Sequence, residues 1–238
     1  MEKQNALQIL IVIPVSTKQW NKPTKRNASR YVSLNTKIDV VNLEKAPEAI
    51  ENHYDVALAA PATVEAVMEA ERKGYDAVVI GCFDDPGLHA ARERVSIPVV
   101  SLGETSMTTA SLLGNKFAVI STGKNSGAIY ERKAMELGLT KRLTYSSGID
   151  VPVLKLTKDK AKVRQQLLRE AKKATDEFGA EAIVLGCGGM MGFSEEMSKI
   201  LGVPVIDPLL ITVKIAETLA TLGLEHSKAR FYHTSSRK

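Results

Sequence analysis

Two cysteines at matching places in the chain are the residues best suited to chemistry. Cys82 ends the segment Gly74–Cys82 and Cys187 ends the segment Gly179–Cys187, and each segment runs from a glycine through an acidic residue and an aliphatic stretch to Gly-Cys. A thiol beside the free N–H groups of a helix N-terminus has a lowered pKa, so part of it is thiolate near neutral pH. A single cysteine after a buried strand often only packs in the core. Two at matching places favour reactive groups instead.

Two such sulfurs suit a proton exchange at carbon. If the two halves of the chain face each other with pseudo-twofold symmetry, one thiolate removes a proton next to a carbonyl and the opposite thiol protonates the other face. General acid–base groups of this kind contribute ~10²–10⁴-fold in rate. Backbone N–H groups of the two loops would hold the developing enolate oxygen. The predicted reaction is an inversion of configuration that needs no cofactor. Two cysteines without further metal-ligand spacing also predict no metal site.

The elements that would position the cysteines repeat along the chain. The runs Ala77–Ile80 and Ile183–Leu185 are apolar at every position, as is typical of parallel strands buried on both faces. Ligand sites in open α/β sheets lie beyond the carboxyl ends of the strands, which is where both cysteines are expected. The spacing of about 105 residues exceeds the ~20–50 residues of solenoid repeats and predicts two similar α/β domains.

Helical patterns alternate with these strands. The clearest runs from Asp159 to Phe178 and ends before Gly179, and a matching helix is expected to start near Pro61 and to end at Gly74. A last helix is expected over Leu209–Leu222, whereas Lys18–Arg30 has the composition of a loop. After Cys82, Asp85 is expected to be the N-cap and Pro86 the first residue of a short helix.

Composition excludes several classes of protein. The 238 residues are 44% hydrophobic and 25% charged, which argues against disorder as the main state. The net charge of +5 is not focused on one element, so we expect no nucleic-acid partner. The longest strongly apolar run, Ala6–Val15, is shorter than the ~20 residues of a membrane helix. The N-terminus fits a signal peptide poorly, and we expect a cytoplasmic protein with no membrane partner.

The motifs around the cysteines resemble those of the aspartate/glutamate/hydantoin racemase superfamily, most closely its hydantoin and allantoin racemase branch. The resemblance covers about Leu7 to Leu222. The segments that carry it are Gly81–Leu88 (GCFDDPGL), Leu185–Met190 (LGCGGM), Gly202–Pro208 (GVPVIDP) and Pro47–Glu51 (PEAIE). Amino-acid racemases of this superfamily usually read Cys-Asn-Thr at the first site and Cys-Thr-His or Cys-Thr-Glu at the second. Phe83 and Gly188 stand there instead, which fits a less charged pocket.

This resemblance implies a fold, a site and a substrate class. The expected fold is α/β, with two pseudo-symmetric flavodoxin-like halves, parallel sheets and the active site in the cleft between them. The first half would comprise residues 1–104 and 209–238 and the second residues 105–208, with the last helix packed on the first half. Cys82 and Cys187 would be the two catalytic bases. The substrate-binding residues would be Pro14, Ser16, Thr17, Phe83, Thr122, Gly188, Gly189 and Met190.

The implied activity is cofactor-independent racemisation at C5 of hydantoins or allantoin. The implied partner is a small neutral cyclic amide, and we expect a homo-oligomer. The chain departs from the branch after the first strand, where Ile13 and Val15 replace the asparagines of Asn-Pro-Asn. Ser16, Thr17, Ser121 and Thr122 would supply replacement hydrogen bonds. Two alternatives stay open: an amino-acid racemase, maleate isomerase-like or decarboxylase-like enzyme of the same fold, and a non-catalytic small-molecule-binding relative.

Overall fold

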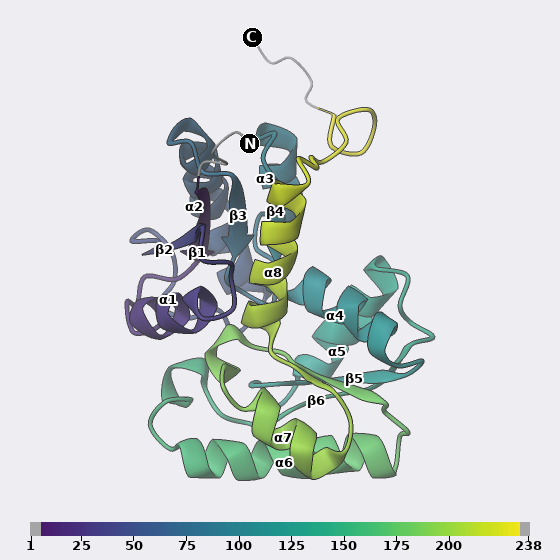
Figure 1. Cartoon of the computed structure of the whole chain (residues 1–238). Helices are drawn as coiled ribbons and strands as arrows, with labels where there is room; N and C mark the ends of the chain where they lie inside the picture. The colour runs from purple at the N-terminus through teal and green to yellow at the C-terminus, as the bar shows by residue number, and fades with distance from the viewer. Residues whose placement is uncertain (1–5, 234–238) are drawn as a thin grey trace. The chain divides into compact units, whose positions relative to one another are not determined.

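A computed structural model describes residues 6–233, which form two compact α/β units (Figure 1). One unit comprises the chain up to Ser101 and the chain from Thr212 onward, and the other is Leu102–Ile211. Each unit contains one four-stranded parallel sheet. No helix in the described part of the chain is long and apolar enough to cross a membrane.

The sheet of the first unit has the strand order β2-β1-β3-β4. Its buried strand residues pack against α2 and α3, with Val67 of α2 and Ala91 of α3 in the same apolar cluster as Val12 and Ile80. The elements are β1 (Leu7–Ile13), α1 (Asn21–Ser29), β2 (Thr36–Asn42), α2 (His53–Arg72), β3 (Ala77–Ile80), α3 (Leu88–Arg94) and β4 (Val99–Ser101).

The sheet of the second unit has the order β6-β5-β7-β8, which is the order of the first sheet with four added to each strand number. The duplication expected from the two Gly-Cys segments is therefore confirmed at the level of topology. Its elements are α4 (Leu102–Leu113), β5 (Phe117–Ser121), α5 (Ser126–Glu136), β6 (Leu143–Gly148), the 3₁₀ turn η1 (Val153–Lys155), α6 (Lys160–Asp176), β7 (Ala182–Leu185), the 3₁₀ turn η2 (Gly188–Met190), α7 (Ser194–Leu201) and β8 (Val205–Ile206).

Helix α6 begins and ends close to where its sequence pattern predicts. The side chain of Asp159 caps it by accepting the N–H of Lys162 at 3.0 Å, and Gly179 follows its end with a φ of 64°. Val163 and Leu167 are fully buried, as the helical spacing predicts. Phe178 lies beyond the last turn and is 41% exposed, so it does not belong to the buried face.

The prediction that α2 starts near Pro61 is wrong, because the helix begins at His53 and contains Pro61 in its interior. The true N-cap is Asn52, whose side chain accepts the N–H of Asp55 at 3.0 Å. The buried positions Ala59, Thr63 and Val67 continue at helical spacing through the proline. Proline usually starts or kinks a helix, and here packing of this face outweighs the one lost backbone hydrogen bond.

The prediction of a loop over Lys18–Arg30 is also wrong, because α1 occupies Asn21–Ser29. The segment has few apolar residues, and only Thr24 and Ala28, one turn apart, are buried. Contacts with β2 hold it: Lys25 Nζ lies 2.9 Å from the Asp39 carboxylate, and the Asn21 side chain donates to Asn42 at 3.2 Å. Tertiary contacts therefore decide this helix.

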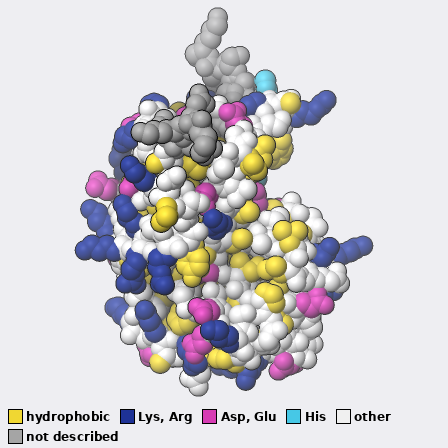
Figure 2. Space-filling view, in the orientation of Figure 1, with side chains coloured by type: hydrophobic (Ala, Val, Ile, Leu, Met, Phe, Trp, Pro, Cys, Tyr) yellow, Lys and Arg dark blue, Asp and Glu magenta, His cyan; other side chains and the backbone are white. Residues whose placement is uncertain are grey.

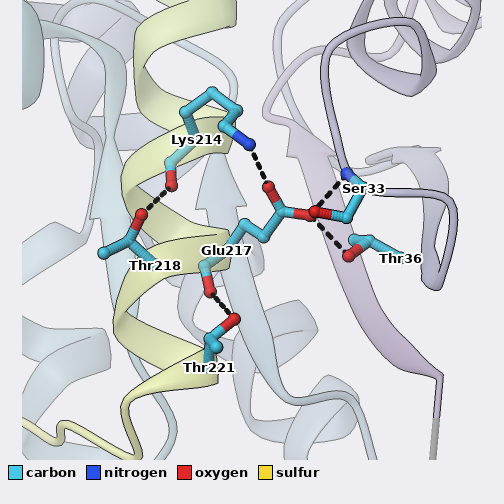
Figure 3. Close-up of polar contacts among 6 residues, drawn as sticks. All are labelled: Ser33, Thr36, Lys214, Glu217, Thr218 and Thr221. Carbon is cyan, nitrogen blue, oxygen red and sulfur yellow. Dashed lines mark hydrogen bonds and ion pairs between the residues drawn. The ribbon is translucent and has the colours of Figure 1, made fainter.

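Helix α8 (Pro208–Thr221) carries the chain from the second unit back to the first. Glu217, which is 4% exposed, anchors it there by accepting the N–H of Ser33 at 2.7 Å and the hydroxyl of Thr36 at 2.6 Å (Figure 3). Lys214 completes the group as the ion-pair partner of Glu217. Burial raises the pKa of Glu217, but hydrogen bonds from Lys214, Thr36 and Ser33 outweigh it and lower the pKa to about 2.

Charged side chains cover both units. Figure 2 shows Lys and Arg spread over the visible face, with Asp and Glu among them. Several of the basic residues are paired within single elements, for example Arg132 with Glu136 and Lys199 with Glu195. Such exposed pairs stabilise a helix only slightly.

Candidate active site

Cys82 and Cys187 occupy equivalent backbone positions in the two units. Each follows a glycine that comes directly after the last residue of a strand, Ile80 of β3 or Leu185 of β7. The Gly81 N–H donates to the Val12 carbonyl at 2.7 Å, and the Gly186 N–H donates to the Ile120 carbonyl at 2.8 Å. Both cysteines are half-buried, and they do not form a disulfide with each other. The strand-end positions expected for the two cysteines are thus found in the structure.

The glycine before each cysteine lies close against the neighbouring strand. A Cβ at Gly186 would lie 2.7 Å from the Cβ of Ser121, and one at Gly81 would lie 3.2 Å from the carbonyl oxygen of Val12. The first distance is too short for any side chain, and the second leaves little room. A glycine before each cysteine therefore allows the backbone to pass close to the neighbouring strand as it leaves the sheet.

The loop after Cys187 begins with the 3₁₀ turn η2, and the cysteine itself is its N-cap. The Gly189 N–H donates to Cys187 Sγ at 3.4 Å, and the Met190 N–H donates to the Cys187 carbonyl at 3.0 Å. Gly188 and Gly189 are half-buried, whereas the Met190 side chain is fully buried. An N–H pointing at sulfur stabilises a thiolate relative to a thiol.

The loop after Cys82 has a different form. Phe83 is 2% exposed, and the Asp85 N–H donates to the Cys82 carbonyl at 3.3 Å. The prediction that Asp85 caps the next helix is wrong, because the N-cap of α3 is Gly87 and the helix starts at Leu88. Gly87 has a φ of 73°, a left-handed conformation that favours glycine, and it moves the helix start beyond Pro86. The Asp85 carboxylate instead accepts the hydroxyl of Ser101.

Residues at the ends of the edge strands contact both cysteine loops, and sequence reasoning missed these residues. Ser101 ends β4, and its Oγ donates to Asp85 and lies 3.3 Å from the Cys82 carbonyl oxygen. Asp207 follows β8, and its Oδ2 accepts the N–H of Gly192 at 3.1 Å. Aligning the two repeats strand by strand would have paired Ser101 with Asp207 and drawn attention to both.

Asp207 is a buried carboxylate with three backbone donors. Besides Gly192, the N–H groups of Leu209 and Leu210 donate to its Oδ1 at 3.0 and 3.4 Å, so it also caps α8. Burial raises the pKa of Asp207, while the three N–H donors act in the opposite direction. The carboxylate thus joins the loop after Cys187 to the start of the last helix.

The expected substrate-binding residues after β1 form a loop that other segments hold in place. The Ser16 N–H donates to the Pro47 carbonyl at 2.9 Å, and the Asn42 side chain donates to the Ser16 carbonyl at 2.8 Å. Pro14 is buried, and Ser16 and Thr17 are half-buried. The structure therefore places the loop after β1, where the chain departs from the branch, against Pro47, the first residue of a segment that carries the resemblance.

Ile13 and Val15, which replace the family's asparagines, are part of the core. They are 5% and 7% exposed. The backbone of Val15 still bonds locally, because its N–H donates to the Ile13 carbonyl at 2.8 Å and its carbonyl accepts the Leu43 N–H at 3.0 Å. Backbone bonds and the Asn42 amide thus hold this loop without amides at positions 13 and 15.

In the second unit, Ser121 and Thr122 occupy the positions equivalent to Ile13 and Pro14, because Ile120 pairs with Leu185 as Val12 pairs with Ile80. Ser121 is used within the fold: its Oγ donates to the Gly186 carbonyl at 2.7 Å and lies 3.1 Å from the Tyr130 hydroxyl. Thr122 is 8% exposed, and its carbonyl accepts the Val151 N–H at 3.1 Å. The Ser121 side chain is thus bonded to Gly186, and the Thr122 side chain is not.

The predicted site residues therefore form two groups, one in each unit. Pro14, Ser16, Thr17, Cys82 and Phe83 follow β1 and β3 at the carboxyl edge of the first sheet. Thr122, Cys187 and Gly188–Met190 follow β5 and β7 at the carboxyl edge of the second sheet. Because both strands of each pair are parallel neighbours, each group is local to one sheet edge.

Comparisons with known proteins agree with this arrangement. The family model described as Asp/Glu/Hydantoin racemase matches residues 9–216. A hydantoin racemase of Pseudomonas sp. (strain NS671) is 36% identical over 98% of this chain and 93% of its own. Among solved structures, an allantoin racemase from Klebsiella pneumoniae superimposes with a TM-score of 0.92 at 30% identity, covering 98% of this chain and 95% of its own.

A second allantoin racemase structure, from Pseudomonas fluorescens, also has a TM-score of 0.92, with 32% identity and 98% coverage of both chains. The match to the family model spans both sheets and both Gly-Cys segments. The chain therefore belongs to the Asp/Glu/Hydantoin racemase family, and its enzyme class is that of an isomerase, a racemase.

Proposed function

We propose that the protein racemises hydantoins or allantoin at C5 by a cofactor-independent, two-cysteine proton transfer. The observation that carries the proposal is the equivalence of Cys82 and Cys187, each presented after a Gly whose N–H bonds to the neighbouring strand. The relatives named above as hydantoin and allantoin racemases support the substrate class. The expected partner is a small neutral cyclic amide bound by a cytoplasmic homo-oligomer.

In the proposed reaction, one cysteine starts as a thiolate and the other as a thiol. The thiolate takes the C5 proton, the C5–H bond breaks, and its electron pair moves onto the adjacent ring carbonyl to form an enolate. The opposite thiol then donates its proton to the other face of C5. Each cysteine ends in the protonation state in which the other began, so the reverse reaction uses the same groups. Each group is expected to contribute ~10²–10⁴-fold.

Contacts at Cys187 suit the thiolate role. The Gly189 N–H points at its sulfur at 3.4 Å, and such donors favour the charged form. The remaining binding roles fall to Ser16, Thr17 and Thr122, to the Gly188–Met190 turn, and to Pro14 and Phe83 as apolar walls. A neutral ring with amide groups requires hydrogen-bond donors and acceptors rather than a cationic cluster.

The test is to incubate the protein with one enantiomer of allantoin or of a 5-substituted hydantoin in D₂O. Racemisation is followed by optical rotation and deuterium incorporation by mass spectrometry. Both are expected in the wild type. Cys82→Ser and Cys187→Ser should each lose racemisation in both directions, because inversion needs both sulfurs. Exchange should survive for one enantiomer only, and that enantiomer should differ between the two variants.

The alternatives predict other results. An amino-acid racemase, or a maleate isomerase-like or decarboxylase-like enzyme, would turn over a panel of carboxylates and leave hydantoins unchanged. A binding protein without catalytic activity would show no exchange with either panel, and its two thiols would titrate independently. The burial of Ile13 and Val15, where the branch has asparagines, is the observation that favours this last alternative.

A further inference from the structure

The two cysteine loops are tied to their sheets by residues at one equivalent position. Val79 of β3 pairs with Val100 and Val184 of β7 pairs with Ile206. The next residues along the edge strands are Ser101 and Asp207, and they occupy the same place in the two repeats. Their side chains differ, but each contacts the loop that follows the cysteine of its own unit.

The contacts in the first unit centre on one hydroxyl. Ser101 is fully buried, and its Oγ donates to the Asp85 carboxylate. The same Oγ lies 3.3 Å from the Cys82 carbonyl oxygen, and the Asp85 N–H donates to that carbonyl at 3.3 Å. Ser101, Asp85 and the backbone of Cys82 thus form one hydrogen-bonded group. Asp85 has a φ of 55°, an uncommon conformation for a residue with a side chain, and the group holds it there.

The contacts in the second unit centre on one carboxylate. Asp207, 6% exposed, accepts the N–H of Gly192 with one oxygen and two N–H groups of α8 with the other. Gly192, with a φ of 88°, ends the glycine-rich stretch Gly188–Gly192. A glycine-rich loop of this kind loses much conformational entropy when it is ordered. The buried Asp207 carboxylate accepts a hydrogen bond from the last residue of this loop and so restrains the loop, because hydrogen bonds are stronger in a low-dielectric interior.

We propose that Ser101 with Asp85, and Asp207, are positioning residues that orient the loops of Cys82 and Cys187 respectively. Each acts through the loop backbone and does not touch substrate. At Cys187 the restraint keeps the Gly189 N–H directed at the sulfur. The catalytic meaning of this positioning rests on the proposed function, whereas the restraint on the thiols does not depend on which substrate is turned over.

The chain offers a variant that separates the two tasks of Asp207. A serine in the N-cap position still accepts an N–H of the first helical turn, but its side chain is too short to reach Gly192. Asp207→Ser therefore keeps the cap of α8 and removes the restraint on the Cys187 loop. Ser101→Ala removes the restraint in the first unit. Ser198→Ala is the matched control, because Ser198 Oγ donates to the Val203 carbonyl at 2.8 Å in the second unit, outside both cysteine loops.

The main measurement is the rate of iodoacetamide alkylation of each cysteine in the folded full-length protein between pH 6 and 10, resolved by peptide mass spectrometry. For Asp207→Ser we expect the pH midpoint of Cys187 to rise by about one unit, the size expected for the loss of one hydrogen bond to a thiolate, with Cys82 unchanged. For Ser101→Ala we expect the alkylation rate of Cys82 to change by about threefold or more, with Cys187 unchanged. Ser198→Ala should change neither cysteine.

The second measurement is racemase kinetics on the same variants. A positioning role predicts that kcat falls by about tenfold while KM changes by less than about threefold. If the wild type racemises no hydantoin but the alkylation profiles still change selectively, the proposed function fails and the positioning role stands. If the wild type is active and Asp207→Ser keeps both its kcat and its Cys187 profile, the positioning role is wrong.

Loss of folding is separated from loss of positioning. A purely structural role would lower the thermal midpoint and change both cysteines equally, and that result would overturn the proposal. Should Asp207→Ser not fold, Asp207→Thr decides the same question, because the threonine hydroxyl also accepts an N–H of the first helical turn and is too short to reach Gly192. A selective change at Cys187 in that variant supports the proposal, and an unchanged Cys187 contradicts it.

Discussion

Glu217 in the last helix accepts the hydroxyl of Thr36 at 2.6 Å, although 181 residues separate the two in sequence (Figure 3). Ser33 and Lys214 complete the surroundings of the same carboxylate. Each donor favours the ionised form, and together they outweigh the cost of burial. This group attaches α8 to β2 and to the turn before it.

Ionised Glu217 is expected to make the protein sensitive to acid. Its pKa falls from 4.5 to about 2 on folding, so its contribution is complete above pH 4.5 and is lost as the pH falls toward 2. Glu217→Gln should lower the free energy of unfolding at pH 7 by about 2 kcal/mol and reduce the loss of stability between pH 5 and 2. Urea unfolding at several pH values measures both. Glu195→Gln, in an exposed pair with Lys199, should leave the pH dependence unchanged.

Gly186→Ala tests the tight exit of the chain before Cys187. The new Cβ would lie 2.7 Å from the Cβ of Ser121, so one strand must move, and overpacking of this kind costs about 1–3 kcal/mol. We expect a lower thermal midpoint. We also expect racemase activity to fall by more than the fraction of folded protein falls at the assay temperature. Gly123→Ala is the control, because among the described residues no atom other than those of Gly123 and its two chain neighbours lies within 4 Å of its added Cβ. Equal stability of the two variants would show that the close approach is not required.

Val15→Asn tests whether the residues that replace the family's asparagines belong to the core. Val15 is 7% exposed, and an amide buried there without partners should cost about 1–3 kcal/mol. Val41→Asn is the control, since Val41 is 38% exposed and its replacement should cost less than about 1 kcal/mol. Denaturant unfolding measures both. A stable Val15→Asn variant with faster turnover would instead mean that this side chain faces substrate.

Tyr130 and Ser121 are expected to act as one unit at the carbonyl of Gly186, the residue before Cys187. Both hydroxyls approach the Gly186 carbonyl, at 3.3 and 2.7 Å, and they lie 3.1 Å from each other. Tyr130→Phe should cost about 1 kcal/mol, and a double-mutant cycle with Ser121→Ala should show a coupling of about 0.5–1.5 kcal/mol. Tyr54→Phe should have no effect, because Tyr54 is 71% exposed. Strict additivity of the two changes would contradict a shared network.

Local sequence was sufficient where it carries strong signals. The fully apolar runs before Cys82 and Cys187 predicted buried parallel strands, because only strands covered on both faces tolerate apolar residues at every position. The helical pattern over Asp159–Phe178 predicted α6, and the repeated Gly-Cys segments predicted the duplicated strand order. These features depend on periodicity and repetition, which a single chain displays without tertiary context.

Other features were decided only by the tertiary structure. Helix α1 has few apolar residues, and it packs against β2 with Thr24 and Ala28 buried and the Asn21 side chain bonded to Asn42. Helix α2 runs through Pro61 because its buried face continues on both sides of the proline. The Asp85 carboxylate accepts a hydrogen bond from Ser101 and does not cap α3. Asp207 accepts a hydrogen bond from Gly192, which lies 15 residues earlier in the sequence. In each case the partner is distant in sequence, so the contact that selects the conformation exists only after the sheet has formed.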